Sequence, residues 1–200
     1  MKTNNNPDIS IIIVHYNTLE LLQQCLDSIL LESKNFSYEI IVVDNASSNN
    51  PKEIILKRYP DIVWIDAGYN SGFSRGNNMG LRHAKGEYGI LLNSDTILER
   101  NALFELLIFY KKKQESLNLG LLGCRLVDEK KELLIGSHIG FPRIYKALNA
   151  NSLVVFTRKK LGQNIEKNKA KSRLLKSEFH SKNHSVDIVS GACVFLISKN

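Results

Sequence analysis

The fold is decided by the stretch ISIIIVHYNT at residues 9–18. The continuous run of mostly β-branched apolar residues at 9–14 predicts a strand buried on both faces, which is typical of a parallel sheet. The polar break HYNT at residues 15–18 comes next, and apolar side chains then recur with helical spacing over residues 21–30. Asn17 and Glu20, three positions apart, predict a capping box at the start of that helix. The order of these pieces predicts a strand, a loop and an amphipathic helix.

The same alternation continues along the chain. Further strands are predicted at residues 38–43, 62–65 and 88–92, and shorter ones at 119–123, 125–127, 132–135 and 186–198. Helices are predicted at residues 51–59 and 99–113, and after the glycine-rich stretch 68–80 a helical pattern runs through residue 84. Strands that alternate with helices predict an α/β fold with a mixed, mostly parallel sheet and helices on both faces.

Composition places the chain among ordinary globular proteins. It has 200 residues, of which 43% are hydrophobic, and no apolar run approaches the roughly 18 residues of a membrane-spanning helix. Because the first residues, MKTNNNPD, contain no apolar core of a signal peptide, we expect a cytoplasmic location. Cys25, Cys124 and Cys193 are widely spaced and fit neither a disulfide framework nor a zinc site, so we expect them to be small buried hydrophobic residues.

The net charge of +7 is concentrated in one segment. Residues 1–142 hold 15 basic and 17 acidic side chains, whereas residues 143–182 hold 11 basic and 2 acidic ones. This distribution argues against a nucleic-acid-binding protein and favours a local anionic partner. We therefore expect a core at residues 1–142, a basic insertion at 143–185 and a returning core strand at 186–200. The basic segment is either a solvated surface insertion or a peripheral contact with anionic headgroups at the inner face of the cell membrane, or with the pyrophosphate of a lipid-linked acceptor.

Polar side chains gather where the predicted strands end. Tyr16 follows the first strand, Asp44 the second, and Asn93 and Asp95 the fourth. In open α/β sheets ligands bind beyond the carboxyl ends of the strands. An aromatic ring can stack on a base, a carboxylate can accept from a base or ribose, and a second carboxylate can hold a hard cation against a diphosphate. The pattern predicts a nucleoside diphosphate site, although Tyr16 can equally be a packing residue and each aspartate a helix cap or turn residue.

Several other kinds of site are disfavoured by the same sequence. The glycines of residues 72–80 do not match G-x-G-x-x-G, and the chain contains neither a P-loop motif nor a G-x-S-x-G motif. Its five histidines have no paired metal-ligand spacing. Dinucleotide, P-loop, serine hydrolase and zinc-enzyme functions are therefore not expected.

Four ordered blocks carry a resemblance to a known family. They read SIIIVHYNT at residues 10–18, IVVDNASS at 41–48, NSGFSRGNNMG at 70–80 and AKGEYGILLNSDT at 84–96. These blocks resemble the inverting GT-A glycosyltransferases of glycosyltransferase family 2, and their wording is most similar to the bacterial rhamnosyltransferase-like branch. A fifth block, VSGACVFLI at residues 189–197, is weaker. The resemblance implies the Rossmann-like GT-A fold of nucleotide-diphospho-sugar transferases.

The resemblance also implies roles for particular residues in holding the nucleotide. Tyr16 would pack on the base, and Asp44 would hold the base or the ribose. Asn70, Arg75 and Asn78 would shape the rest of the nucleotide pocket.

Metal binding is implied by the last strand-end motif. Asn93 and Asp95 would occupy the D-x-D position that binds Mg2+ or Mn2+ together with the sugar-nucleotide diphosphate. Asn93 replaces the first aspartate, so one carboxylate remains. A single carboxylate suffices for Mg2+, which keeps several waters and also binds phosphates.

The implied reaction transfers a sugar from a nucleotide-diphospho-sugar donor to a saccharide or lipid-linked acceptor, with inversion, in bacterial surface polysaccharide synthesis. In the family the general base lies in an acidic block that we expect beyond Asn200, so the sequence is interpreted as a fragment; Asp187 is not expected to be the base. Two alternatives stay open. A sugar-nucleotide nucleotidyltransferase would need a glycine-rich, positively charged loop at residues 15–18, and a noncatalytic nucleotide-sugar-binding fragment would need no base.

Overall fold

The computed structural model describes residues 6–49, 51–117, 119–132, 138–139, 188–189 and 191–198. The chain divides into two compact units, one formed by Met1–Cys124 with Gly191–Asn200 and the other by Arg125–Ser190. The predicted basic insertion, its boundaries and its contact with a membrane lie outside the described residues and stay predictions. Among the described residues, no helix is both long enough and apolar enough to cross a membrane.

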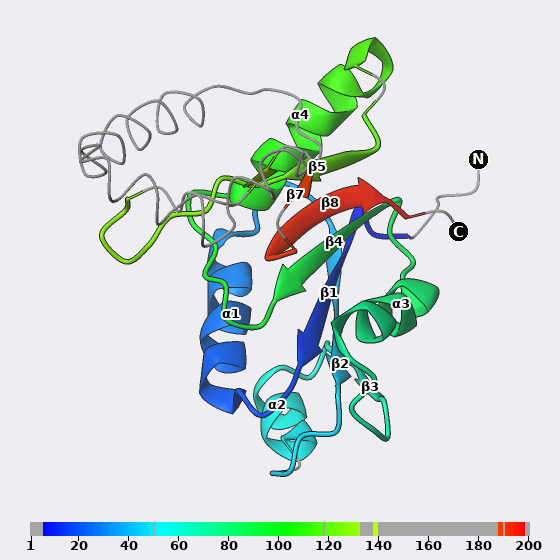
Figure 1. Ribbon diagram of the computed structural model, residues 1–200, viewed down its shortest axis with the longest axis vertical. Coiled ribbons are helices and arrows are strands. Elements are labelled where there is room, and N and C mark those ends of the chain that lie inside the picture. The colour runs from blue at the N-terminus through cyan, green and yellow to red at the C-terminus, as the bar shows by residue number, and fades with distance from the viewer. Residues whose placement is uncertain are drawn as a thin grey trace, which may run out of the picture. The chain divides into compact units, whose positions relative to one another are not determined.

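The first unit is built on one six-stranded sheet (Figure 1). Its spatial order is β3-β2-β1-β4-β8-β5. The strands are β1 Ile9–His15, β2 Tyr38–Asp44, β3 Val63–Asp66, β4 Tyr88–Asn93, β5 Leu121–Gly123 and β8 Cys193–Ile197. Strands β1 to β4 pair in parallel, and β8 is antiparallel to both β4 and β5. The mixed, mostly parallel sheet predicted from the sequence is confirmed.

Helices cover both faces of this sheet, as the alternating pattern predicts. They are α1 Leu19–Glu32, α2 Lys52–Arg58, α3 Phe73–His83 and α4 Ala102–Leu117. Side chains from α1, α2 and α4 join one hydrophobic core with the odd-numbered residues of β1. Figure 1 shows α3 on the other side of the sheet from α1. Because helices lie on both faces, every residue of β1 is buried, which explains the apolar run from Ile11 to Val14.

Two glycines allow α3 to approach β1 closely. A Cβ at Gly76 would stand 3.0 Å from the methyl groups of Val14, and a Cβ at Gly80 would overlap Ile12. These two positions are one turn apart, so both face the sheet. The glycine-rich sequence of residues 70–80 therefore has a packing reason, which is the contact between this helix and the central strand.

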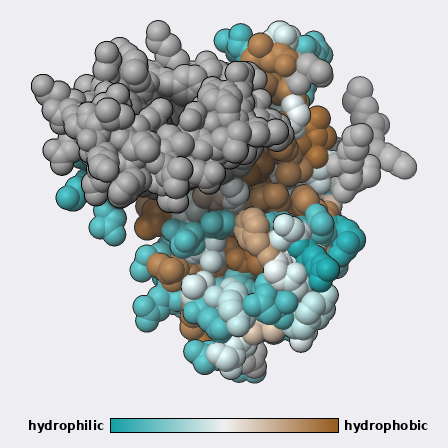
Figure 2. All heavy atoms as spheres, viewed as in Figure 1, coloured by the Kyte–Doolittle hydropathy of each residue, from teal (hydrophilic) through white to brown (hydrophobic). Residues whose placement is uncertain are grey.

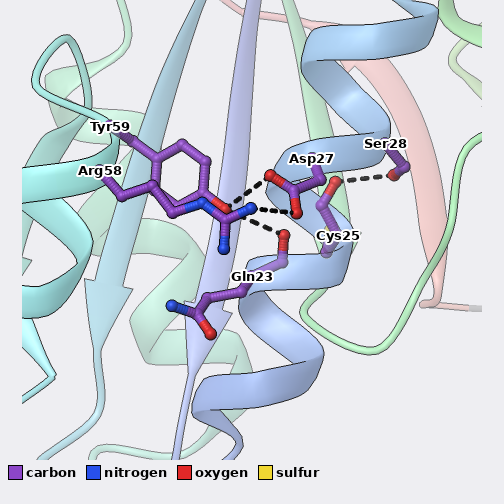
Figure 3. A network of polar contacts seen from close by, with 6 residues as sticks. All are labelled: Gln23, Cys25, Asp27, Ser28, Arg58 and Tyr59. Carbon is purple, nitrogen blue, oxygen red and sulfur yellow. Dashed lines mark hydrogen bonds and ion pairs between the residues drawn. The ribbon is translucent and has the colours of Figure 1, made fainter.

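A polar network joins α1 to the residue after α2 (Figure 3). The Tyr59 hydroxyl donates to the Asp27 carboxylate at 2.8 Å and to the Gln23 carbonyl at 3.2 Å, and the Arg58 guanidinium donates to Asp27 at 2.7 Å. Burial, followed by the hydrogen bond to Asp27, raises the pKa of Tyr59 to about 12. The same figure shows Ser28, whose hydroxyl donates to the Cys25 carbonyl at 2.7 Å. The bonds from Tyr59 and Arg58 tie the end of α2 to α1, whereas the Ser28 bond lies within α1.

The strand β8 carries the last described residues of the chain into the sheet between β4 and β5. Its Phe195 is fully buried, and its ring centroid lies 5.4 Å from that of Tyr88 and 5.1 Å from that of Tyr110. Beyond this cluster, Figure 2 shows a hydrophobic surface near α4 and β5, where Ile108 and Leu121 are exposed.

The second unit contains the short strands β6 His138–Ile139 and β7 Ile188–Val189, which pair antiparallel. The single strand predicted over residues 186–198 is therefore two strands, β7 and β8, which belong to different sheets and are separated by a turn that includes Gly191. Most of the strand predicted at residues 132–135 lies outside the described residues.

The helix expected after the glycine-rich stretch begins inside it, because α3 covers Phe73–His83, and residues 125–127 form no strand. Three other details of the sequence prediction are also wrong. The capping box does not form, because α1 begins after Thr18 without a side-chain cap and Asn17 accepts hydrogen bonds from Ser48 instead. The helix predicted from residue 99 starts at Ala102, since Arg100 and Asn101 adopt positive φ values of 53° and 54°.

The third detail concerns the cysteines. Cys25 and Cys193 are buried as expected, but Cys124 is half-buried and its sulfur contacts that of Cys193. The wide spacing of the cysteines along the chain gave no indication that two of their thiols would be in contact.

Candidate functional site

The candidate site lies at the carboxyl edge of the sheet beside β1. The chain moves from β1 to β2 and β3 on one side, and β4 lies on the other side, so the strand order reverses at β1. The pairing sets His15 beside Asp44 and Val14 beside Asn93. The loops after β1, β2 and β4 therefore leave the sheet at the same edge, which is where open α/β sheets bind ligands.

The loops after β1 and β2 are fastened to each other. The Asn17 side-chain oxygen accepts from the Ser48 backbone N–H at 2.8 Å, and the Asn17 backbone N–H donates to the Ser47 hydroxyl at 2.9 Å. Both loops contain a left-handed residue, Asn17 with φ of 55° and Ala46 with φ of 66°. Such backbone conformations are uncommon outside glycine and tend to gather at functional sites.

Asp44 and Tyr16 occupy these two loops. Asp44 is only 7% exposed, and its carboxylate accepts from the Ser47 hydroxyl at 2.5 Å and from the Ser47 backbone N–H at 3.2 Å. A carboxylate offers about four lone-pair directions, so it retains capacity for a ligand. Tyr16 is 46% exposed, so part of its side chain is accessible to a ligand.

Asn45 connects β2 to the loop that carries Asn70. The Asn45 side-chain oxygen accepts from the backbone N–H of Ser71 at 2.8 Å and from its hydroxyl at 2.9 Å, while its amide donates to the Asn70 side chain at 2.9 Å. Asn70 also accepts from the backbone N–H of Gly72 at 3.1 Å. The sequence places Asn45 beside Asp44 among the polar residues after the second strand, but it does not show that Asn45 links this loop to Asn70.

The turn after β4 carries Asn93 and Asp95. It is joined to the first loop through Thr18 and Ser94, whose hydroxyl oxygens lie 3.2 Å apart. The Asn93 side-chain oxygen is buried and has no hydrogen-bond partner among the described residues. Asp95 is exposed. One side chain of this turn thus presents an acceptor without a donor, and the other presents a carboxylate to solvent.

Arg75 and Asn78 lie on α3, three positions apart and exposed, whereas Gly76 and Gly80 face the sheet. In the described part of the chain, no hydrogen bond joins either residue to the loops after β1, β2 or β4. The structure therefore brings Tyr16, Asp44, Asn70 and the turn after β4 together through hydrogen-bonded loops, but does not tie these two side chains to them.

His15 is the buried last residue of β1, and not the loop histidine that the polar break after the first strand predicts. Its Nδ1 lies 3.3 Å from the Thr18 hydroxyl, and its Nε2 has no partner among the described residues. Burial lowers the pKa of His15, and the charge of Asp44 opposes part of that change. The ring is therefore neutral at neutral pH and cannot add a positive charge beside the base position.

Cys25 lies beneath the turn after β4. Its thiol is 3.7 Å from the Asn93 carbonyl oxygen. Burial, and next the charge of Asp95, raise its pKa to about 12. Cys25 stays a neutral thiol at neutral pH, which excludes it as a nucleophile.

The residues at this edge can hold a divalent cation only if the phosphates of a bound nucleotide supply the rest of its coordination shell. The described residues include no cluster of three or more His, Cys, Asp or Glu side chains that could hold a metal ion. Asp95 nevertheless offers one exposed hard oxygen donor. Mg2+ is commonly bound by one or two carboxylates together with water and substrate phosphates, and this edge matches that mode of binding.

Comparison with known proteins supports the same fold and family. Among curated proteins, the poly(ribitol-phosphate) beta-glucosyltransferase of Bacillus spizizenii is 35% identical over 119 residues, which cover 57% of this chain and 19% of that protein. Among solved structures, Staphylococcus aureus TarS 1–349 matches with a TM-score of 0.55 at 20% identity, covering 66% of this chain and 39% of that chain. The same protein in complex with UDP-GlcNAc matches with a TM-score of 0.51 at 22% identity, covering 60% of this chain and 34% of that chain.

A third neighbour is the mannosyltransferase PcManGT from Pyrobaculum calidifontis in complex with GDP-Man and Mn2+, with a TM-score of 0.50 at 23% identity, covering 62% of this chain and 37% of that chain. At these identities the structural matches establish the fold. The chain spans well under half the length of each of these relatives. The family model of glycosyl transferase family 2 matches residues 10–163, and the chain therefore belongs to that family.

Proposed function

We propose that the described core binds the donor of an inverting glycosyltransferase, a nucleotide-diphospho-sugar held with Mg2+ or Mn2+. The sugar would pass to a saccharide or lipid-linked acceptor in bacterial surface polysaccharide synthesis. The observation that carries this proposal is the set of hydrogen bonds joining the loops after β1, β2 and β4 at the point where strand order reverses. These bonds organise an edge at which sugar nucleotides can be held before any ligand arrives.

The nucleoside would be held on the β1 and β2 side of this edge. Tyr16 has an exposed ring for the base, and Asp44 has a buried carboxylate oriented by Ser47 that can accept from a base N–H or a ribose hydroxyl. Asn70, oriented by Asn45, would close the pocket. Arg75 and Asn78 would extend it from α3.

The diphosphate would be held on the β4 side. Asp95 is the proposed metal ligand, and the unpartnered oxygen of Asn93 can accept from a ribose hydroxyl, which would satisfy a buried group that is costly to leave unbonded. When bound, the cation neutralises the charge that develops on the diphosphate leaving group. Because His15 is neutral, it does not attract the negatively charged phosphates toward the base position.

The relatives support this chemistry by what they bind. TarS is known with UDP-GlcNAc, PcManGT with GDP-Man and Mn2+, and the Bacillus relative is named for poly(ribitol-phosphate) as its acceptor. The motif wording at residues 41–48 and 84–96 supports a finer proposal, that this chain is close to the rhamnosyltransferase-like branch. Membership of the family favours transfer over the nucleotidyltransferase alternative.

Calorimetry with UDP, GDP and dTDP, each with and without Mn2+, tests the donor site. We expect at least one nucleoside diphosphate to bind, and Mn2+ to raise its affinity. Asp95→Asn should remove the effect of Mn2+ while metal-free binding stays. Tyr16→Ala should weaken binding equally with and without metal, because its ring contacts the base and not the phosphates.

Asp61→Asn is the matched control, since Asp61 is an exposed aspartate outside these loops. It should bind as the unaltered protein does. Failure of all three nucleotides to bind would contradict the donor site, and an unchanged Mn2+ effect in Asp95→Asn would contradict the metal assignment alone. The noncatalytic alternative predicts the same binding without release of nucleoside diphosphate from a sugar donor, which a coupled phosphate assay measures.

A further inference from the structure

A pair of thiols lies where the chain leaves the six-stranded sheet and where it returns. Cys124 follows β5 directly, and Cys193 is the first residue of β8. The antiparallel register runs from Leu121 opposite Leu196 to Gly123 opposite Val194, so Cys124 and Cys193 are the next opposing pair. Their sulfur atoms are 2.7 Å apart, and both cysteines are free.

This arrangement satisfies the main geometric requirement of a disulfide. Directly opposed residues of an antiparallel pair have Cα atoms about 4.5–5.5 Å apart, within the range of about 4.4–6.8 Å found for disulfides. The strands need no rearrangement to bring the two sulfur atoms together, because they are already in contact. Cys25, the third cysteine, lies on α1 and its thiol is directed at the Asn93 carbonyl.

We propose that Cys124 and Cys193 form a reversible dithiol–disulfide modification site at the two points where the chain passes to and from the second compact unit. That unit, Arg125–Ser190, begins at the residue after Cys124 and ends shortly before Cys193. A bond between the two sulfurs would close the chain into a loop whose ends are 69 positions apart. Both cysteines belong to the first unit, so the bond would join the end of β5 to the start of β8 at the two points where the chain leaves and re-enters the sheet.

The two thiols have different parts in this chemistry. Cys124 is half-buried and is the one that an oxidant reaches, whereas Cys193 is 3% exposed. The contact with Cys124 and burial both raise the pKa of Cys193, so Cys193 acts second. A low-molecular-weight disulfide is attacked by the Cys124 thiolate, which forms a mixed disulfide and releases one thiol. Cys193 then loses its proton and attacks the Cys124 sulfur, which forms the protein disulfide and releases the second thiol.

Closure of this loop should stabilise the folded chain. A cross-link restricts the unfolded chain more when the loop it closes is longer, and this loop is long. β8 lies between β4 and β5 in the sheet. A bond from its first residue to the residue after β5 therefore also opposes the separation of β5 from β8. Oxidation is therefore expected to raise the Tm, and a reducing agent should reverse the increase.

The test uses the full chain treated with oxidised glutathione under native conditions, then alkylated and mapped by mass spectrometry. We expect the three free thiols to fall to one, a cross-linked pair of peptides containing Cys124 and Cys193, and a higher Tm that dithiothreitol reverses. Cys25→Ala is the matched control and should still form the cross-link. Cys124→Ser should keep Cys193 unmodified and show no Tm increase.

Four results would overturn the proposal: no loss of thiols from the folded protein, a stable glutathione adduct on Cys124 without a cross-link, a link that involves Cys25, or a link between two chains. Each is read directly from the peptide map. Because the readouts are thiol content and unfolding temperature, the outcome does not depend on the proposed sugar transfer.

Discussion

Asn45 is a buried side chain whose amide organises two loops of the candidate site. Its oxygen accepts twice from Ser71 and its nitrogen donates to Asn70. The backbone N–H of Asn45 also donates to the His15 carbonyl at 2.8 Å. Asn45 therefore connects the ends of β1 and β2 to the loop before α3. We infer that it helps to set the shape of the site.

Asn45→Ala should lower the free energy of unfolding by about 1–3 kcal/mol, because it removes the acceptor of the buried Ser71 backbone N–H. Urea denaturation followed by circular dichroism measures the change. Asn49→Ala, an exposed asparagine of the same loop, should change stability by less than about 0.5 kcal/mol. Equal effects of the two substitutions would refute the role given to Asn45.

His15 predicts a loss of stability in mild acid. Burial lowers its pKa in the folded chain from the ordinary 6.5, so the unfolded chain binds the proton more readily. The stability contributed by the neutral ring is complete above pH 6.5 and is lost as pH falls through the folded-state pKa. Asp44 is the charged neighbour that limits this loss. The slope can reach about 1.4 kcal/mol for each pH unit.

His15→Gln should flatten this dependence between about pH 6.5 and pH 5, as measured by urea midpoints at several pH values. His83→Gln, at an exposed histidine of α3, should leave it unchanged. Asp8 and Asp66 do not confuse the result, because hydrogen bonds from Ser37 and Lys52 lower their pKa values below 3.8 and their contribution is lost only in stronger acid. An unaltered pH profile in His15→Gln would count against a buried neutral imidazole.

At the scale of elements, the contact between α3 and β1 decides how the Arg75 and Asn78 face is presented. The helix lies against the central strand because Gly76 and Gly80 have no side chains. A larger residue at either position would push the helix outward, together with the residues proposed to extend the nucleotide pocket.

Gly80→Ala should destabilise the protein by about 1–2 kcal/mol, because the overlap with Ile12 outweighs the gain of about 1 kcal/mol in helix propensity. Gly76→Ala should cost less, since its Cβ would stand 3.0 Å from the Val14 methyl groups, which can shift slightly. Chemical denaturation of both variants gives the comparison. A Gly80→Ala variant more stable than the original chain would show that the helix can move away from β1 freely.

At the scale of the whole molecule, β8 completes the sheet that carries the site. Its Ala192 neighbour accepts from the backbone N–H of Asn93 at 3.0 Å, so the returning segment also supports the turn after β4. Phe195 anchors the strand by packing on Tyr88 from β4 and Tyr110 from α4. Residues from distant parts of the chain thus form one aromatic cluster.

Phe195→Ala should lower the free energy of unfolding by about 3–5 kcal/mol, as the loss of a fully buried aromatic side chain does. Ile197→Ala, on the same strand but 47% exposed, should cost less than about 1 kcal/mol. Thermal and urea unfolding of the two variants measure both values. A small effect at Phe195 would contradict the anchoring of β8 by the packing of Phe195 on Tyr88 and Tyr110.

Much of the core could be predicted from local pattern. The strands β1, β2 and β4 are largely buried on both faces, so each contains a short run of consecutive apolar residues, and α1 has regular apolar spacing. The edges were harder to predict. The start of α4 depends on two residues with positive φ, and the division of residues 186–198 depends on a turn at Gly191 that separates two sheets.

The site was predictable only in its outline. The side chains at the strand ends could be named because parallel strands bring their carboxyl ends to one edge, whatever the loop details. The contacts of Asn17 with Ser48 and of Asn45 with Asn70 could not, because each joins positions 25 or more apart. The same holds for Cys124 and Cys193, which look unrelated until β5 and β8 pair.

Local hydrophobic pattern and motifs of adjacent residues were enough to predict the order of strands and helices, the family, and the edge of the sheet at which polar residues gather. Folding of the whole sheet was needed to place β8 between β4 and β5, to pair Asn17 with Ser48 in place of a capping box, and to bring two distant thiols into contact. The physical reason is that strand pairing and side-chain hydrogen bonds between loops depend on distances in space, and these distances are set only when the whole sheet has formed.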